Sequence, residues 1–252
     1  MAKTVLIPAA GAGSRFKNAG INVAKPLIIA KGRTLLEHTL DCFEFANEDH
    51  LILAVQHKHE VRKALEKKLK RRLPKVNIHW FELEQLLPGQ LATSVAALES
   101  ILQTSDLDES LPLLIHNCDT GFQWKPEFES IQGFASMAVF PAKGTHWSFG
   151  QPDPKDSHRA IAIAEKKRIS DLASIGLYGF SSTKIFLKEA KAVLYSQDTI
   201  EGEYYIAPML HKAITKGMEV SLPRVDKVKI YGTPGELCEC FKLSLETLKS
   251  EN

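Results

Sequence analysis

The chain has 252 residues, of which 44% are hydrophobic and 25% are charged. This is the ordinary composition of a globular protein, and it allows a large buried core. The formal net charge of +2 is the small difference between 32 basic and 30 acidic residues, so no strong overall field favours nucleic acid or a membrane surface. We therefore expect neither as a partner, and we expect any site for a polyanion to be local.

No segment of the sequence predicts export or membrane insertion. The apolar run near the start, residues 5–10, contains Pro8 and is far shorter than a signal-peptide core or the roughly 20 residues that span a bilayer. We expect a cytoplasmic protein. The four cysteines lack CxxC or Cys/His ligand spacing, so we expect reduced thiols and no transition-metal site.

Strand-like and helix-like segments alternate through residues 1–120. Val5, Leu6 and Ile7 form a continuous apolar run before a glycine-containing loop, which predicts a buried central strand. The other elements predicted in this half are strands over 51–56, 76–81 and 112–117 and helices over 34–46, 60–73 and 91–102. This alternation favours a mostly parallel sheet that is covered on both faces.

The remaining residues, 121–252, contain more strand-like segments joined by turn-rich connections. The elements predicted here are strands over 134–141, 159–164, 174–181, 219–222 and 227–231 and helices over 182–195, 204–216 and from Pro234 onward. These strands should extend the sheet, partly in antiparallel fashion. Without a linker, repeat or low-complexity tract, we predict one domain over 1–252, a three-layer α/β/α sandwich around a Rossmann-like, mostly parallel mixed sheet.

The loop of residues 9–15, Ala-Ala-Gly-Ala-Gly-Ser-Arg, is the most informative segment. Its glycines and small neighbours let backbone N–H groups approach an anion closely, and Arg15 adds a forked cation. Phe16 stands where the third glycine of a dinucleotide fingerprint belongs, and no lysine follows at Walker spacing, so neither of those common interpretations holds. An ordinary turn remains the alternative for the loop alone.

Lys25 stands immediately before Pro26. Because proline restricts the preceding residue, we predict an extended backbone at position 25 that holds the ammonium group near the first loop. A Lys-Pro pair by itself is usually a surface turn. Together with the glycine-containing loop, it supplies the second cation that a triphosphate requires.

At this point the chain resembles the nucleotidyltransferases of the sugar-nucleotide pyrophosphorylase type. Segments in family order carry the resemblance: IPAAGAGSRFKNAGINVAKPLI (7–28), PGQLATSV (88–95), IHNCDT (115–120), AEKKRISDLASIGLYGF (164–180), GEYYIAP (202–208) and YGTPGEL (231–237). The subset that the chain resembles is the capsule-type or dTDP-glucose-pyrophosphorylase-like enzymes. The resemblance implies a GT-A-like fold with a nucleotide-binding half in 1–120 and an acceptor-binding half in 121–252.

The resemblance also implies the reaction and its participants. A nucleoside triphosphate would donate its nucleoside monophosphate to a phosphorylated small molecule, a sugar 1-phosphate in the first instance, with Mg²⁺ as cofactor and release of pyrophosphate. The product would serve as a precursor for polysaccharide or capsule. Phosphocholine-like and phosphorylated amino-acid acceptors stay open, as do CTP, dTTP, UTP and GTP.

The implied catalytic residues are Arg15 for the β- and γ-phosphates, Lys25 for the α-phosphate and Asp119 for Mg²⁺. A carboxylate after an apolar strand is also where α/β sheets place ligands, and Mg²⁺ requires only one or two carboxylates. The implied nucleotide-binding residues are Ala9, Ala10, Gly11, Gly13, Ser14 and Gln90. Gln90 would contact the base, although a glutamine at a helix start is often only a capping residue.

The acceptor is assigned to residues of the second half together with the end of the strand before Asp119. The implied acceptor-binding residues are Asn117, Glu165, Lys166, Gly176, Tyr178 and Glu203. Strand alternation predicts that Asn117 points the same way as Asp119, and that only one of Lys166 and Lys167 faces the pocket.

One position departs from the family pattern. Many relatives carry an aspartate two residues before the late Gly-Thr pair, where this chain has Ile230. Asp226 is the nearest substitute as a second metal ligand, although a lone aspartate before a strand is usually a turn residue.

Two other functions stay open at this stage. A glycosyltransferase on a related sheet would use a ready-made nucleotide sugar, but it usually holds its metal through Asp-x-Asp, of which residues 117–119 supply half. A non-catalytic nucleotide-binding homologue would explain the missing second aspartate. The sequence is compatible with a homo-oligomer and does not determine the oligomeric state.

Overall fold

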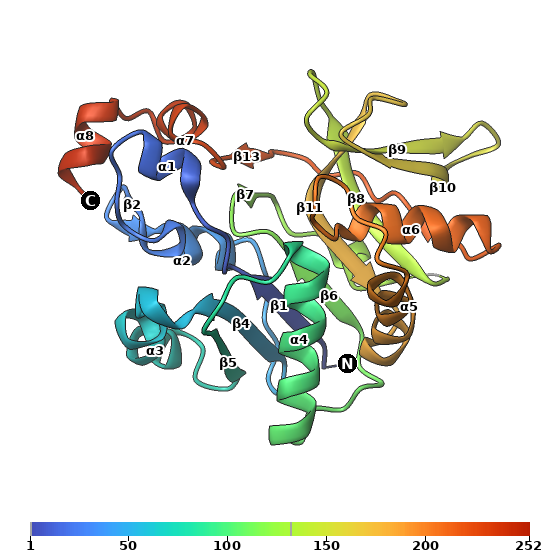
Figure 1. Cartoon of the computed structure of the whole chain (residues 1–252), viewed down its shortest axis with the longest axis horizontal. Helices are drawn as coiled ribbons and strands as arrows, with labels where there is room; N and C mark the ends of the chain where they lie inside the picture. Colours follow the sequence, from blue (N-terminus) through green and yellow to red (C-terminus); the bar gives the residue numbers. More distant parts are fainter. Residues whose placement is uncertain (1, 132) are drawn as a thin grey trace.

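The computed structural model describes residues 2–131 and 133–252, which form a nine-stranded mixed sheet with helices against both faces (Figure 1). The strands lie in the order β5-β4-β1-β6-β11-β8-β12-β10-β9. Strands from both halves of the chain therefore share one sheet, and β6 and β11 join the halves.

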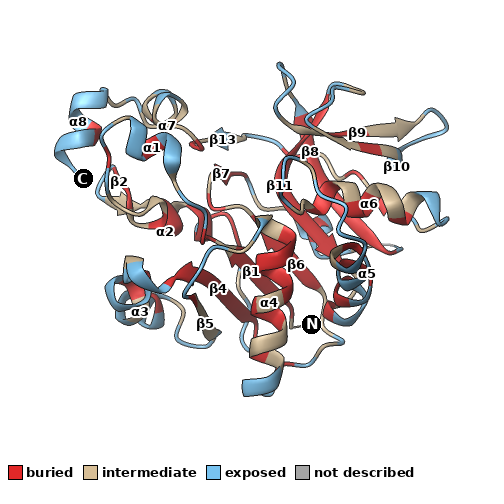
Figure 2. Cartoon of the chain, in the orientation of Figure 1, coloured by how far each residue is buried: buried red, intermediate tan, exposed pale blue. Residues whose placement is uncertain are grey.

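The first half of the chain supplies the parallel part of this sheet. Strand β1 (Thr4–Pro8) lies between β4 (His50–Gln56) and β6 (Leu113–His116), and β4 continues the sheet to β5 (Asn77–Leu83), all in parallel pairs. The central strands of this part are buried along their length (Figure 2). Burial on both faces is the reason that they are continuously apolar rather than alternating.

Alternate residues of β1 belong to different hydrophobic cores. Leu6 packs in the core that includes α4 (Gly89–Thr104), whereas Val5 and Ile7 pack in the core that includes α3 (Val61–Arg72). Each fully buried aliphatic side chain of this kind contributes on the order of 1.5 to 3 kcal/mol to folding. The two cores hold the carboxyl end of β1 in place from both sides, and the glycine-containing loop begins there.

The second half adds a mostly antiparallel extension. Strand β11 (Leu172–Phe180) pairs antiparallel with β6 and with β8 (Ala135–Pro141), and β8 pairs parallel with β12 (Val220–Ser221). Strand β10 (Asp156–Glu165) pairs antiparallel with β12 and with β9 (Ser148–Asp153). Helices α5 (Thr183–Ser196) and α6 (Ile206–Thr215) contribute to the same core as α4.

A third, smaller core joins the two ends of the chain. Phe16 of α1 (Ser14–Asn18) packs in it with Leu237 of α7 (Pro234–Phe241) and Leu248 of α8 (Leu245–Ser250). Figure 1 shows these helices together at one corner of the molecule. The remaining short elements are η1 (Lys25–Leu27), β2 (Ile29–Ala30), β3 (Arg33–Thr34), α2 (Leu35–Leu40), η2 (His57–His59), β7 (Thr120–Gly121), η3 (Pro126–Phe128) and β13 (Lys229–Ile230).

Two local predictions are wrong, and one strand was not predicted. The helix predicted over 34–46 ends at Leu40, because the chain turns there and Phe43 packs edge-on against Phe122, with 5.5 Å between ring centroids. Strand β9 was not predicted, because its sequence SFGQPD has no strand periodicity. Only its pairing with β10 makes this segment a strand. Lys25 begins a 3-10 turn, and the extended residue is Ala24 instead.

The described helices include none that is both long enough and apolar enough to cross a membrane.

Candidate active site

A cavity of about 970 Å³ opens at the carboxyl ends of β1 and β6 and is bordered on its other side by β11 and the end of β10. Its size suits a nucleotide-sized ligand. The sequence-predicted residues that line it are Ala9, Ala10, Gly11, Gly13, Ser14, Arg15, Lys25, Gln90, Asn117, Asp119, Glu165, Lys166, Gly176, Tyr178 and Glu203. The cavity therefore brings together side chains from both halves of the chain.

The glycine-containing loop follows β1 directly and borders the cavity with its backbone. A Cβ added at Gly11 would meet nothing within 4 Å, so the backbone there faces open space. Gly13 has a φ of 66°, a left-handed conformation that glycine adopts without strain, and it precedes α1. Gln56 holds the loop from β4 by donating its amide N–H to the carbonyl oxygens of Ala10 (2.6 Å) and Gly11 (3.2 Å).

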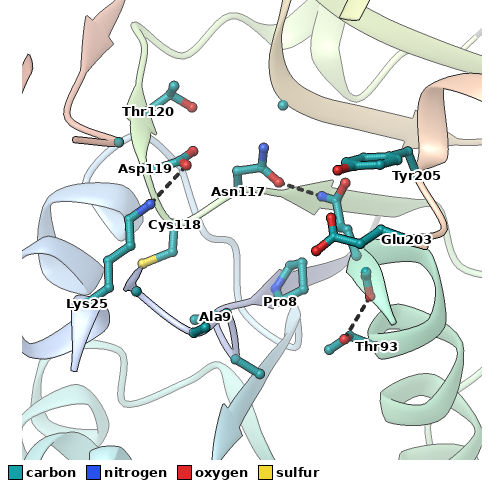
Figure 3. Close-up of a pocket in the computed structure, with 18 of the residues that line it drawn as sticks. Pro8, Ala9, Lys25, Thr93, Asn117, Cys118, Asp119, Thr120, Glu203 and Tyr205 are labelled. Carbon is teal, nitrogen blue, oxygen red and sulfur yellow. Dashed lines mark hydrogen bonds and ion pairs between the residues drawn. The ribbon is translucent and has the colours of Figure 1, made fainter. Parts of the chain in front are cut away.

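Lys25 and Asp119 form an ion pair inside the cavity (Figure 3). Lys25 Nζ donates to Asp119 Oδ2 at 2.9 Å, and the two side chains are 18% and 24% exposed. Lys25 Nζ also lies 6.0 Å from the centre of the Phe16 ring. Arg15 lines the same cavity from α1 and is exposed, and no ion pair of this residue occurs among residues 2–131 and 133–252.

The electrostatics of this group favour an ionised Asp119. Burial alone would raise the pKa of its carboxyl group, but the charge and the hydrogen bond of Lys25 outweigh burial, with smaller contributions from His116 and Arg15. The pKa of Asp119 is therefore below its ordinary value. The carboxylate is available as a hard oxygen ligand at neutral pH.

Asn117 directly follows β6, and Cys118 and Asp119 form a turn after it. It bonds to Gln90, whose amide N–H donates to Asn117 Oδ1 at 2.6 Å, while Asp119 turns toward Lys25 (Figure 3). Strand alternation therefore did not explain why both residues line the cavity. Gly176 makes room for Asn117, because a Cβ at position 176 would lie 2.3 Å from Asn117 Nδ2.

Of the two adjacent lysines, Lys166 lines the cavity and Lys167 does not, and Glu165 lines it beside Lys166. A left-handed φ of 52° at Lys166, just after β10, breaks the strand alternation. Lys166 pairs with Glu201 and lies over the Tyr205 ring, 5.3 Å from its centre. Its pKa is raised above the ordinary value, first by the hydrogen bond to Glu201.

The end of the cavity that β10 and β11 border contains the carboxylate of Glu165 in a partly buried setting. Glu165 accepts a hydrogen bond from Ser148 of β9. Burial raises the pKa of the Glu165 carboxyl group above its ordinary value, against the lowering effects of Ser148 and Lys166. Burial also raises the pKa of Tyr178 to about 12. Its hydroxyl therefore stays neutral and can donate or accept a hydrogen bond.

Cys118 also lines the cavity, between Asn117 and Asp119. Burial raises the pKa of its thiol to about 12, which keeps it protonated at neutral pH. A thiol in this state is a poor nucleophile, so covalent catalysis by cysteine finds no support here.

The structure corrects one of the predicted metal ligands. Asp226 does not line the cavity; its side chain is 67% exposed and pairs with Lys125 at 3.0 Å. It precedes β13 in an exposed loop and pairs with a surface lysine, as a turn residue does. Asp119 is therefore the only one of the two predicted ligands at the cavity.

The sequence did not single out three polar residues that matter to this geometry. Gln56 is the last residue of a buried strand, and a polar side chain at that position is a signal that could have been used. Ser148 lies on the unpredicted strand β9. Glu236 lines the cavity from the first turn of α7, and only the pairing of β13 with β7 brings it there.

Comparison with known proteins places this geometry in context. Residues 5–125 match the family model of the MobA-like NTP transferase domain. The crystal structure of the nucleoside-diphosphate-sugar pyrophosphorylase from Vibrio cholerae RC9 is 29% identical, with a TM-score of 0.85 over 94% of this chain and 99% of that chain. No curated protein matches the sequence.

Two further solved structures share the fold at lower identity. The inositol-1-phosphate CTP transferase from T. maritima is 15% identical, with a TM-score of 0.71 over 98% of this chain and 96% of that chain. A UDP-glucose pyrophosphorylase is 13% identical, with a TM-score of 0.72 over 96% of this chain and 97% of that chain. The matches confirm the α/β fold class predicted from the sequence, with helices flanking a mixed sheet.

Proposed function

We propose that this chain, a nucleotidyltransferase with a MobA-like NTP transferase domain in residues 5–125, joins a nucleoside monophosphate to a sugar 1-phosphate and releases pyrophosphate. The observation that carries the proposal is that Arg15, Lys25 and Asp119, from three distant stretches of the chain, line one cavity. A guanidinium, an ammonium and a carboxylate around one space are the groups that hold a polyphosphate and its cation.

The triphosphate is assigned to the glycine-containing loop and its neighbouring cations. Gln56 holds the carbonyl groups of Ala10 and Gly11, and the Ala9 N–H donates to the Ala54 carbonyl oxygen, so the N–H groups of residues 10–13 are the ones assigned to the ligand. Arg15, exposed at the cavity, is assigned to the β- and γ-phosphates. Lys25, 2.9 Å from Asp119, is assigned to the α-phosphate.

The base is assigned to the segment around Gln90 at the start of α4. The amide N–H of Gln90 is used by Asn117 Oδ1. The Gln90 carbonyl oxygen remains as an acceptor for an N–H group on a base edge. Every common nucleobase offers such a group, so this contact supports base binding and does not select one base.

The acceptor is assigned to the end of the cavity that β10, β11 and the segment before α6 enclose. Lys166 is the cation there, and its partner Glu201 would yield it to the acceptor phosphate. Glu165 and Glu203 also line this end, and carboxylate oxygens accept hydrogen bonds from hydroxyl groups. A phosphorylated polyol such as a sugar phosphate matches this arrangement, because its phosphate would pair with Lys166 and its hydroxyl groups would donate to the carboxylates beside it.

The transfer itself requires no general base. A phosphomonoester has a second pKa near ~6 and is largely ionised at neutral pH. Its oxygen forms a bond to the α-phosphorus, the bond from that phosphorus to the α,β-bridging oxygen breaks, and pyrophosphate leaves with the electron pair. Lys25 and Arg15 then act by positioning the phosphates in line and neutralising charge.

The proposed cofactor, Mg²⁺, is consistent with the oxygen groups at the cavity. Asp119 is ionised and partly exposed there, and one or two carboxylates with phosphate and water oxygens are the ligands that Mg²⁺ prefers. When bound, Mg²⁺ neutralises the polyphosphate and stabilises the charge that develops on pyrophosphate. Asp119 would hold the ion, and Lys25 would then turn from Asp119 to the nucleotide.

Pyrophosphate release with a panel of substrates tests this function. The purified protein is incubated with each of CTP, dTTP, UTP and GTP, with Mg²⁺, and with sugar 1-phosphates, phosphocholine or a phosphorylated amino acid. We expect release with at least one sugar 1-phosphate, and a loss of at least 100-fold in kcat/KM for Lys25→Met and for Asp119→Asn. Asp226→Asn, outside the cavity, is the matched control and should retain full activity. The proposal is overturned if no pair releases pyrophosphate.

A further inference from the structure

Gly232 separates two carboxylates that belong to distant parts of the chain. A Cβ at this position would lie 3.3 Å from Asp119 Oδ2 and 3.4 Å from Glu236 Oε2. The φ of Gly232 is not positive, so conformational freedom does not explain a glycine here. The absence of a side chain leaves a small space that both carboxylate oxygens border.

This arrangement is built by backbone pairing. Strand β13 pairs with β7, and the N–H of Tyr231 donates to the carbonyl oxygen of Asp119 at 3.0 Å. Thr233 then caps α7, its Oγ1 accepting the N–H of Glu236 at 3.2 Å. Because both contacts involve backbone atoms, the positions of Asp119 and Glu236 relative to Gly232 follow from the fold.

The two carboxylates differ in their partners. Asp119 Oδ2 accepts a hydrogen bond from Lys25, whereas no ion pair of Glu236 occurs in the part of the chain that the structure describes. Glu236 nevertheless lines the cavity assigned to a polyphosphate. A carboxylate in that position repels phosphate oxygens unless a cation lies between them.

We propose that Glu236 is the second carboxylate of the divalent-cation site and holds the ion together with Asp119. The proposal rests on the proposed function, which assigns the cavity to a nucleotide and Mg²⁺. Two carboxylates with water and phosphate oxygens match the coordination that Mg²⁺ prefers. Glu236 thus takes the role that the sequence had given to Asp226, which lies outside the cavity.

Mn²⁺ binding in the absence of substrates tests the proposal. The free ion is followed by electron paramagnetic resonance while Mn²⁺ is titrated into wild type, Glu236→Gln and Glu239→Gln. Glutamine keeps the size of the side chain and the backbone N–H that Thr233 caps. Glu239 is exposed on the same helix and does not line the cavity, so its variant changes net charge equally and serves as the control.

We expect one Mn²⁺ per chain in wild type, an affinity at least tenfold weaker in Glu236→Gln, and a change of less than twofold in Glu239→Gln. Equal affinities in wild type and Glu236→Gln would overturn the proposal, and so would equal losses in the two variants. Unchanged far-ultraviolet circular dichroism verifies that each variant is folded.

The outcome is separable from that of the proposed function. If no substrate pair releases pyrophosphate but Mn²⁺ affinity depends on Glu236, the cation site stands and the reaction is wrong. If pyrophosphate is released and Mn²⁺ affinity does not depend on Glu236, the reaction stands and this ligand assignment is wrong.

Discussion

Substitution of Gly176 by alanine tests whether this glycine exists to accommodate Asn117. Gly176 lies in β11 with a φ of 75°, and an added Cβ would come within 2.3 Å of Asn117 Nδ2 and 2.7 Å of Asn117 Cγ. The amide of Asn117 would have to move, which would also break its 2.6 Å hydrogen bond with Gln90. We therefore expect Gly176→Ala to reduce both stability and nucleotide binding.

Two terms set the size of the stability loss. A left-handed backbone conformation at an alanine costs about 1 to 2 kcal/mol, and forcing a methyl group into a packed site costs about 1 to 3 kcal/mol more. Gly32 provides a control for the first term alone, because it has the same φ of 75° and an added Cβ there would meet nothing within 4 Å. Gly32→Ala should therefore lose only about 1 to 2 kcal/mol.

Urea unfolding followed by circular dichroism measures these losses for both single variants and for a double-mutant cycle with Asn117→Ala. Removing the Asn117 amide should relieve most of the steric clash, because only Asn117 Cβ, 3.0 Å from the added methyl carbon, then remains. Gly176→Ala should therefore cost less in the Asn117→Ala background than in wild type. The coupling energy should be about 1 to 3 kcal/mol. The reasoning is refuted if Gly176→Ala costs the same in both backgrounds, since the clash with Asn117 would then contribute nothing.

Three further variants test the electrostatic assignments. Glu201→Gln removes the ion pair of Lys166, so the KM for the acceptor should fall several-fold while the KM for the nucleotide changes little. Steady-state kinetics measures both values, and an unchanged ratio of the two would contradict the role given to Lys166. Glu165→Gln should raise the thermal midpoint at pH 7, because burial raises the pKa of the folded-state carboxyl group and the folded protein therefore has to ionise a disfavoured group. As the pH falls through the raised pKa toward the ordinary glutamate value, the wild-type Glu165 carboxyl group becomes protonated in the folded state, so the gain in thermal midpoint should shrink. A gain that grows on acidification would contradict the stated direction of the pKa shift. Asp226→Asn should leave the Mg²⁺ concentration for half-maximal activity unchanged, and an increase would restore Asp226 as a ligand.

The sequence by itself determined the fold class and most of the first-half elements, because both depend on local patterns. A short, continuous apolar run such as 51–56 favours a strand that is buried on both faces, and the alternation of such runs with helical spacing predicts a covered, largely parallel sheet. The loop at 9–15 could be predicted for a similar reason, because the glycines and small residues that let backbone N–H groups approach an anion are consecutive in the sequence.

The tertiary structure alone decided how the distant parts of the site meet. Asp226 and Glu236 are both carboxylates near the late Gly-Thr pair, and no local pattern distinguishes a surface partner of Lys125 from a residue at the cavity. The choice depends on the pairing of β7 with β13, which contributes a contact between Tyr231 and Thr120 across 111 residues of sequence. Such a contact is set by which surfaces pack together after the chain has folded, and single-sequence periodicity carries no record of it.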